Sequence, residues 1–237
     1  MTITPPAADA GLKDRLWRTL ILVASIWVIS DLGYYLLLPL LGAKPSYNAG
    51  SVAVTLYYIF WIGIAVISFW DLYGRWTKFE NKLASYAVWS ISFGGCTLFA
   101  AYLLPLLPPT NWTQPFSPPE VAIATEWYFL PKSVDILFQQ LLIVALVLSL
   151  STRGITLSRI SLYCAALFGG THVLLAFGGV PLGYVIRFMV FAALFGLIFP
   201  YLILRLPNGL GYSYMLHWLY YAITVVMPRI FSSPPAA

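Results

Sequence analysis

The chain has 237 residues, of which 60% are hydrophobic and 9% are charged, and its formal net charge is +5. An ordinary globular domain carries about 25% charged residues, so this composition excludes a water-soluble domain. Apolar runs of about 20 residues recur without strict alternation, which predicts transmembrane helices rather than the strands of a membrane β-barrel. We therefore expect an all-α, polytopic bundle of transmembrane helices.

The first 16 residues form a polar tail that is rich in proline and alanine. No signal-peptide cleavage pattern follows, so the first apolar run is expected to remain as a membrane anchor. Seven segments are predicted as spans, at residues 17–41, 52–70, 84–107, 133–150, 160–177, 181–204 and 211–227. Only the short Gly178–Gly179 turn separates the fifth and sixth segments, which leaves six or eight spans as alternatives.

These segments divide the chain into regions. After the tail at residues 1–16, the first three spans occupy residues 17–107, and a proline-rich extracytoplasmic loop occupies residues 108–132. Four further spans form a core at residues 133–229, followed by a C-terminal tail at residues 230–237. Within the loop, residues 121–130 are expected to form a short helix at the membrane surface, with Trp127 and Tyr128 at headgroup level.

Lysine and arginine residues gather on one side of the predicted membrane. Nine of them fall on the side of the N-terminus: Lys13, Arg15, Arg18, Arg75, Lys78, Lys82, Arg153, Arg159 and Arg205. Only Lys44, Lys132 and Arg229 fall on the other side. Because positive charge is retained on the cytoplasmic side, we expect a cytoplasmic N-terminus. The same bias explains the basic net charge without a nucleic-acid partner.

Five ionisable residues lie inside the predicted spans, where a charge at the bilayer centre costs about 3 kcal/mol or more. They are Asp31, Asp135, His172, Arg187 and His217. Most have a structural explanation. Asp135 could be a helix-start acid beside an N-cap Ser133, and Arg187 could reach the headgroups. His172 could simply donate to a backbone or side-chain oxygen, and His217 could form a helix–helix hydrogen bond.

Asp31 is harder to explain, because its short side chain in the middle of a span needs a protonated state or a partner. Arg187 or a histidine could serve Asp31, and Arg187 could equally neutralise Asp135. Gln139 lies four residues after Asp135 and shares its helix face. Together these residues predict one shared polar pocket.

An acid and two imidazoles beside water are the components of hydrolysis. We expect no cofactor, although two histidines and one carboxylate also match the ligands of a catalytic zinc and leave a divalent metal open. The chain lacks the His-Glu-x-x-His pair of the zincins.

Three segments near the end of the chain occur in a suggestive order. Val134-Asp135-Ile136-Leu137-Phe138-Gln139 opens the fourth span, Phe168-Gly169-Gly170-Thr171-His172 lies in the fifth, and a glycine-containing sixth span leads to His217 and Tyr221. They resemble the CAAX-protease and bacteriocin-processing family of glutamic-type intramembrane peptidases. That family carries Glu-Glu-x-x-x-Arg, then Phe-x-x-x-His, then a histidine followed at i+4 by Asn. The resemblance covers about residues 133–227 and implies a divergent member.

The resemblance implies that Asp135 activates water and that His172 and His217 stabilise the oxyanion or act as ligands. The supporting residues would be Gln139, Tyr221, Arg187, Asp31 and Phe168. The first family motif is degenerate, because Val134 and Asp135 replace the glutamates and Gln139 replaces the arginine. Since a misplacement of 1 Å can cost about 100-fold in rate, weak, altered or absent peptidase activity also fits.

Three functions therefore stay open. The first is a membrane-embedded peptidase that hydrolyses a membrane-associated peptide or protein substrate, in the inner (plasma) membrane of a bacterium. The second is a catalytically silent relative that acts as a membrane scaffold or binding subunit, with a membrane-protein partner. The third is a small transporter or proton relay that uses Asp31, Asp135 and the histidines. In each case membrane lipid surrounds the chain.

Overall fold

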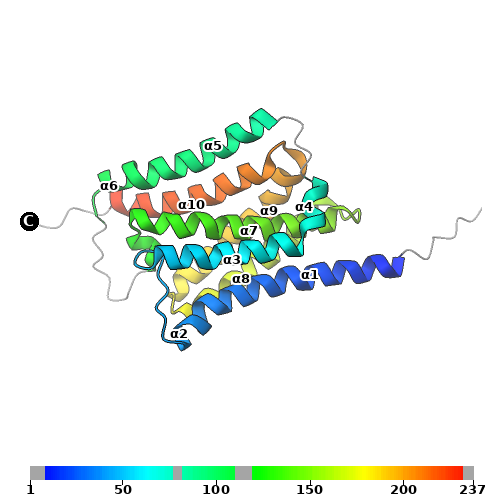
Figure 1. Cartoon of the computed structure of the whole chain (residues 1–237), viewed down its shortest axis with the longest axis horizontal. Coiled ribbons are helices and arrows are strands. Elements are labelled where there is room, and N and C mark those ends of the chain that lie inside the picture. The colour runs from blue at the N-terminus through cyan, green and yellow to red at the C-terminus, as the bar shows by residue number, and fades with distance from the viewer. Residues whose placement is uncertain (1–8, 77–81, 110–118, 232–237) are drawn as a thin grey trace, which may run out of the picture.

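The computed structural model describes residues 9–76, 82–109 and 119–231, which form a bundle of antiparallel helices without strands (Figure 1). The long helices are α1 (Asp9–Leu32), α3 (Ser51–Ser68), α5 (Lys82–Leu98), α7 (Phe129–Ser151), α8 (Leu157–Thr171), α9 (Leu182–Arg205) and α10 (Gly209–Phe231). The short ones are α2 (Leu38–Leu40), α4 (Trp70–Trp76) and α6 (Leu104–Leu106). The expected all-α architecture is confirmed.

Six segments of the described chain are long and apolar enough to cross a membrane, so this is an integral membrane protein. They are Trp17–Leu40, Ser51–Ser68, Lys82–Leu106, Glu126–Ser151, Leu157–Gly178 and Leu182–Arg205. The seventh predicted span coincides with α10, which has 23 residues and is long enough, at about 34 Å, to cross a hydrocarbon core of about 30 Å. It is less apolar than the other six because it carries several tyrosines and His217.

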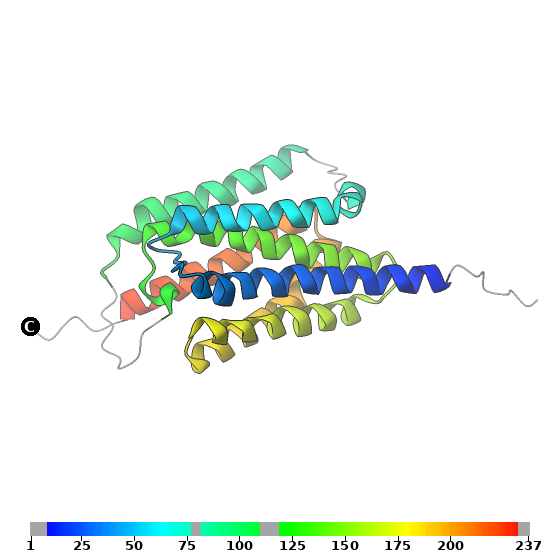
Figure 2. The same ribbon diagram turned by 60° about the horizontal axis from the view of Figure 1, so that its bottom comes forward.

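Helix α7 is the centre of the bundle. In Figures 1 and 2 it runs through the middle, with α3 and α10 alongside, whereas α5 lies at the edge. Of its most apolar 18-residue window, 72% is buried inside the protein, against 17–33% for the other five candidate spans. This position lets α7 carry buried polar side chains that other helices can hydrogen-bond.

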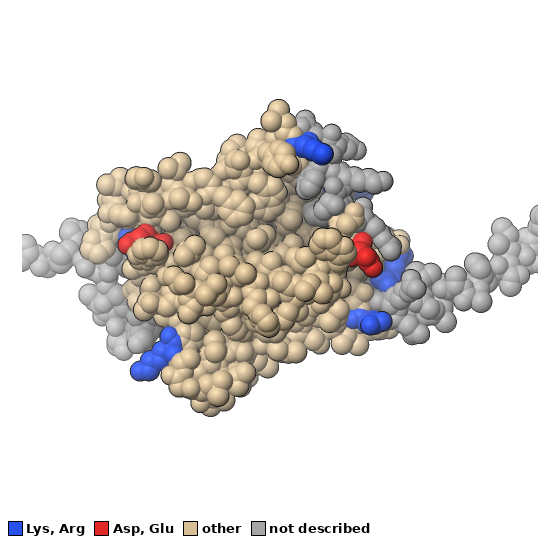
Figure 3. All heavy atoms as spheres, viewed as in Figure 1, with Lys and Arg blue, Asp and Glu red and all other residues tan. Residues whose placement is uncertain are grey.

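The outer surface is suited to lipid. Large apolar side chains on the outer helix faces are exposed, for example Ile67 at 80% and Leu106 at 81%. On the face drawn in Figure 3, charged side chains lie at the two ends of the bundle and none is visible in the middle. A band without charge flanked by charged ends is the pattern that a bilayer requires.

Two helices leave the α-helical repeat just before a proline. The π-helical turns η1 (Gly33–Leu37) and η2 (Phe99–Leu103) each precede a Leu-Pro-Leu segment, α2 and α6. A proline inside a helix has no N–H to donate and crowds the carbonyl one turn earlier, and a π turn relieves this conflict. The first π turn, η1, changes the direction of Tyr34 and Tyr35, which both line the cavity described below.

Helices α8 and α9 pack closely through glycine. A Cβ on Gly196 would lie 2.5 Å from the Cα of Ala165, so only glycine allows this approach. The fifth predicted span ends differently from a regular α-helix, because residues from His172 onward form the 3₁₀ helix η5 (His172–Gly178). Gly179 then adopts a positive φ of 72°, and the predicted turn separates the fifth and sixth helices.

The predicted surface helix at residues 121–130 is wrong. Two short 3₁₀ turns, η3 (Glu120–Ile123) and η4 (Glu126–Tyr128), replace it, and α7 starts at Phe129 rather than at 133. Pro131 does not prevent this early start, because the N–H groups of the first turn have no partner within the helix anyway. Trp127 is exposed, but Tyr128 is buried.

Candidate functional site

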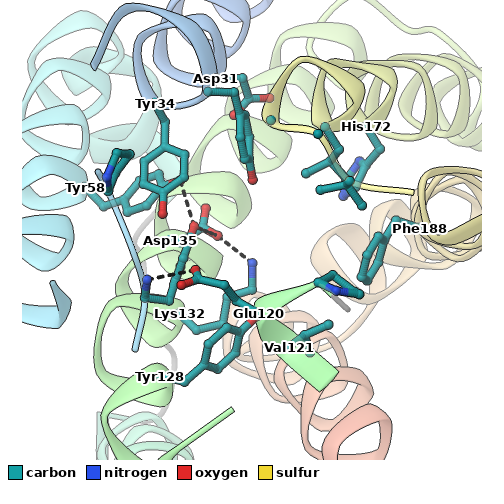
Figure 4. Close-up of a pocket in the computed structure, with 18 of the residues that line it drawn as sticks. Asp31, Tyr34, Tyr58, Glu120, Val121, Tyr128, Lys132, Asp135, His172 and Phe188 are labelled. Carbon is teal, nitrogen blue, oxygen red and sulfur yellow. Dashed lines mark hydrogen bonds and ion pairs between the residues drawn. The ribbon is translucent and has the colours of Figure 1, made fainter. Parts of the chain in front are cut away.

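A cavity of about 510 Å³ enters the bundle between α1, α7, η5 and α10 (Figure 4). Its rim includes exposed residues at positions 43–44 and 178–179. Inward it reaches Asp31, nine residues before the end of the first span at Leu40 and therefore about 14 Å along the helix. This size is within the range of small-ligand pockets, and its depth is close to the middle of a bilayer.

The carboxylate of Asp135 accepts three hydrogen bonds in the wall of this cavity. Its Oδ2 accepts from Nζ of Lys132 at 2.8 Å and from the hydroxyl of Tyr47 at 3.0 Å. Its Oδ1 accepts from Nε2 of Gln139 at 2.7 Å. Hydrogen bonds to a charged group contribute about 1.5–3 kcal/mol each, which offsets the desolvation of a side chain that is only 3% exposed.

Asp135 is not the helix-start acid that the sequence allowed. Because α7 begins at Phe129, Asp135 lies in the second turn. Ser133, the expected N-cap, instead donates to the carbonyl oxygen of Phe129 at 2.6 Å and accepts from Nε1 of Trp218 at 3.0 Å. The role of Asp135 is therefore set by side chains of the cavity and not by the helix dipole.

Lys132 is the partner of Asp135 that the sequence reasoning missed. Its ammonium group is buried and lies 4.1 Å from the ring centre of Tyr221 and 5.0 Å from that of Tyr47. An ammonium group on an aromatic face is stabilised by the ring quadrupole. The i,i+3 spacing of Lys132 and Asp135 on one helix was the local signal for this pair.

Tyr47 and Tyr58 extend the network to α3. Their hydroxyl oxygens are 2.8 Å apart, and because the one proton of Tyr47 points to Asp135, Tyr58 donates to Tyr47. Tyr47 lies between the first two spans, where burial, and then the charge of Asp135, raise its pKa well above the usual value. The phenol therefore stays protonated and remains a donor.

Asp31 lines the same cavity without such support. It is half-buried, and among the described residues no side chain or backbone group donates a hydrogen bond or forms an ion pair with it. The expected partners do not reach it. The π turn that follows places Tyr34 on the cavity wall near Asp31 (Figure 4). Tyr35 of the same turn also lines the cavity.

His172 also lines the cavity, at the start of η5. Its Nδ1 donates to the carbonyl oxygen of Phe168 at 2.7 Å, which leaves Nε2 as the free ring nitrogen. In a 3₁₀ helix, residues three apart lie above one another, so His172, Leu175 and Gly178 face the cavity together. Gly178 allows this packing, because a Cβ there would lie 2.5 Å from the ring of Tyr35.

His217 is separated from the cavity. It is 2% exposed and does not line the cavity wall. Its Nδ1 accepts from Nε2 of Gln140 at 3.3 Å. The ring of Phe168 packs edge-on against both imidazoles, 5.1 Å from His172 and 5.4 Å from His217, so a predicted supporting residue lies between the two histidines.

The two remaining predicted residues take separate positions. Tyr221 lines the cavity and carries Lys132 on its ring face. Arg187 is exposed and donates to the hydroxyl of Thr224 at 3.2 Å. Of the alternatives that the sequence left open for Arg187, pairing with Asp135 or Asp31 is therefore not found among the described residues.

This arrangement brings Asp135, His172 and Tyr221 to one cavity but not His217. Within the described residues, no three His, Cys, Asp or Glu side chains are grouped so that they could hold a metal ion. The cavity offers an ion pair whose carboxylate accepts three protein hydrogen bonds, one carboxyl group without a partner among the described residues, and aromatic walls. These are elements of molecular recognition more than of acid–base chemistry.

No protein-family model, no curated protein and no solved structure matches this chain.

Proposed function

We propose that the protein is a membrane-embedded binding protein that holds a small ligand in the cavity. The observation that carries this proposal is the hydrogen bonding of the Asp135 carboxylate. All three donors around it are protein groups, and one of them is an ammonium group at 2.8 Å. The cavity beside it nevertheless has room for a ligand of about 510 Å³.

The carboxylate of Asp135 is poorly placed to act as a general base. A general base must be within hydrogen-bond reach of the water that it activates, whereas the oxygens of Asp135 already accept three hydrogen bonds from protein donors. The second histidine of the expected constellation also lies behind Phe168. Both features favour binding over hydrolysis.

Hydrolysis of a membrane-associated peptide is the second candidate, because Asp135 and His172 do line one cavity. The test is cleavage of a membrane-tethered reporter by Asp135→Asn, His172→Ala and His217→Ala, at matched expression. Loss of cleavage in all three variants would replace the binding proposal with a peptidase. Absence of cleavage by the wild type, or unchanged cleavage in the variants, supports binding.

The binding proposal itself is tested by filling the cavity. In lipid nanodiscs, a panel of small amines, carboxylates and alcohols is screened for compounds that raise the midpoint of thermal unfolding, since a ligand that binds only the native state stabilises it. Leu175→Trp, which fills the cavity, should abolish any shift. Leu174→Trp is the matched control, because Leu174 is also half-buried but does not line the cavity. No shift in the wild type, or equal shifts in both variants, contradicts the proposal.

We also propose that the protein lies in a bacterial plasma membrane with its N-terminus in the cytoplasm. Among the described residues, Arg18, Lys82, Arg153, Arg159 and Arg205 lie at the end where α1 starts, which supports a cytoplasmic side there. The cavity would then open outward. In intact cells, an impermeant maleimide should label Lys44→Cys and not Arg159→Cys, whereas the reverse pattern would invert the topology. The native Cys96 and Cys164 are buried.

A further inference from the structure

We propose that the cavity selects ligands that carry a protonated amine, and that Asp31 is the counter-ion of that amine. This inference rests on the proposed function, because it names the chemical class of the ligand in the same cavity. It is carried by unsatisfied acceptors, by the aromatic walls and by the balance of charges.

Asp31 is an acceptor that has no hydrogen-bond or ion-pair partner among the described residues. The other two carboxylates that line the cavity are satisfied. Asp135 accepts three hydrogen bonds, and Glu120 accepts from the hydroxyl of Ser46 and from the backbone N–H of Tyr47. A carboxyl group at mid-membrane depth is stable in its charged form only beside a cation. A ligand ammonium group would provide that cation from within the cavity.

A second, independent observation concerns the amide of Gln139. Its Nε2 donates to Asp135 at 2.7 Å, so the orientation of the amide is determined by the carboxylate. Its Oε1 is buried and has no hydrogen-bond partner among the described residues, and the residue lines the cavity at 9% exposure. A carbonyl oxygen only accepts hydrogen bonds, so this atom also requires a donor such as N–H.

The hydroxyl of Tyr34 is a further buried group without a partner in the described chain, on a residue that is 4% exposed and lines the cavity. A phenol can accept from an amine or donate to another polar atom of the ligand. Asp31, Gln139 and Tyr34 are thus three residues that line one cavity and carry a polar group without a partner in the described chain.

Aromatic rings line the cavity together with Asp31. Trp27 lies four residues before Asp31 on α1 and shares its helix face, and the π turn η1 carries Tyr34 and Tyr35, which also line the cavity. Rings of Trp and Tyr attract organic cations through their negative faces, so the wall and the carboxyl group favour the same kind of ligand.

The charged groups that line the cavity also favour a ligand with an ammonium group. Among the described residues, Asp31, Asp135 and Glu120 line it together with two ammonium groups, those of Lys132 and Lys44. Lys132 is already paired with Asp135 and covered by the rings of Tyr47 and Tyr221, and Lys44 is exposed on the rim. Inside the cavity, a ligand carboxylate would therefore find the ammonium group of Lys132 occupied, whereas a ligand ammonium group would find the carboxyl group of Asp31.

The test compares benzylamine with benzyl alcohol and benzoate, which share a ring and differ in charge. Binding to the full chain in phosphatidylglycerol nanodiscs is measured by calorimetry at neutral pH. We expect benzylamine to bind about 10-fold or more tightly than either analogue, the equivalent of one charge-assisted hydrogen bond. Asp31→Asn should remove this preference, and Asp31→Glu should retain it. Asp71→Asn, which changes an exposed acid at the opposite end of the bundle, should leave it unchanged.

Equal affinity for the amine and the alcohol, or an unchanged preference in Asp31→Asn, would overturn the inference. If other members of the earlier panel stabilise the protein but no amine binds, the inference fails and the binding function stands. If nothing binds in the wild type, both fail. The amine could also belong to a lipid headgroup. Nanodiscs that contain phosphatidylethanolamine should weaken benzylamine binding if it does, and should leave that binding unchanged if the ligand is a free amine.

Discussion

Helices α7 and α1 each place an aspartate in the wall of the cavity, but the two aspartates differ in the hydrogen bonds that they accept. On α7, Asp135 is surrounded by three donors that the protein supplies. On α1, Asp31 has no donor among the described residues. A buried charge that is fully satisfied can hold helices together, whereas an unsatisfied one has a cost that function must explain. The two aspartates share a residue type and differ in the hydrogen-bond donors that the protein supplies to them.

The largest effect is expected from breaking the pair on α7. Lys132→Met leaves Asp135 buried without its cation, and removal of one partner of a buried ion pair costs about 3–5 kcal/mol. The free energy of unfolding in mixed detergent micelles should fall by that amount. Lys44→Met, at an exposed lysine of the rim, should change it by less than about 0.5 kcal/mol. Similar values for both variants would mean that the pair has no structural role.

Tyr47→Phe removes one donor from Asp135 without changing the ring. A hydrogen bond to a charged group contributes about 1.5–3 kcal/mol, so the free energy of unfolding should fall by about 2 kcal/mol. The same variant should also lower the Tm in nanodiscs. A loss below about 0.5 kcal/mol would show that Asp135 does not depend on Tyr47.

Asp31→Asn should raise the free energy of unfolding, whereas Asp135→Asn should lower it. Asparagine at position 31 removes an unsatisfied carboxyl group, so we expect a gain of about 1 kcal/mol. Asparagine at position 135 leaves Lys132 unpaired and should destabilise. Chemical unfolding of the two variants, measured side by side without ligand, decides the comparison. A loss of stability in Asp31→Asn would point to a structural role for Asp31.

The smallest effect is expected for Tyr34→Phe. The hydroxyl of Tyr34 has no partner in the described chain, so its removal should change the free energy of unfolding by about 0.5 kcal/mol or less. Tyr34 and Tyr47 are neighbours with ring centres 5.5 Å apart, which makes the two Phe variants a matched pair. Equal losses of unfolding free energy in Tyr34→Phe and Tyr47→Phe would mean that the hydroxyl groups of the two walls contribute equally to stability.

Part of the site could be predicted because the relevant interactions are local. Asp135 and Gln139 share a helix face by their i,i+4 spacing, and their side chains do hydrogen-bond at 2.7 Å. Lys132 follows the same logic at i,i+3, but it is the last residue of the segment predicted as the outer loop, so the sequence pattern does not place it on the helix of Asp135. In contrast, Tyr47 is 88 residues away from Asp135, and no local spacing relates the two.

The sequence by itself determined the membrane environment and the approximate helices, because long apolar runs must pair their backbone groups internally in lipid. Tertiary structure decided which polar side chains meet. The π turn before Pro39 and the 3₁₀ helix after Thr171 redirect Tyr34 and His172 by amounts that hydropathy cannot encode. The packing of Phe168 against both imidazoles separates His172 from His217. These outcomes depend on how helices that are distant in the chain pack, and an apolar surface pattern leaves that packing open.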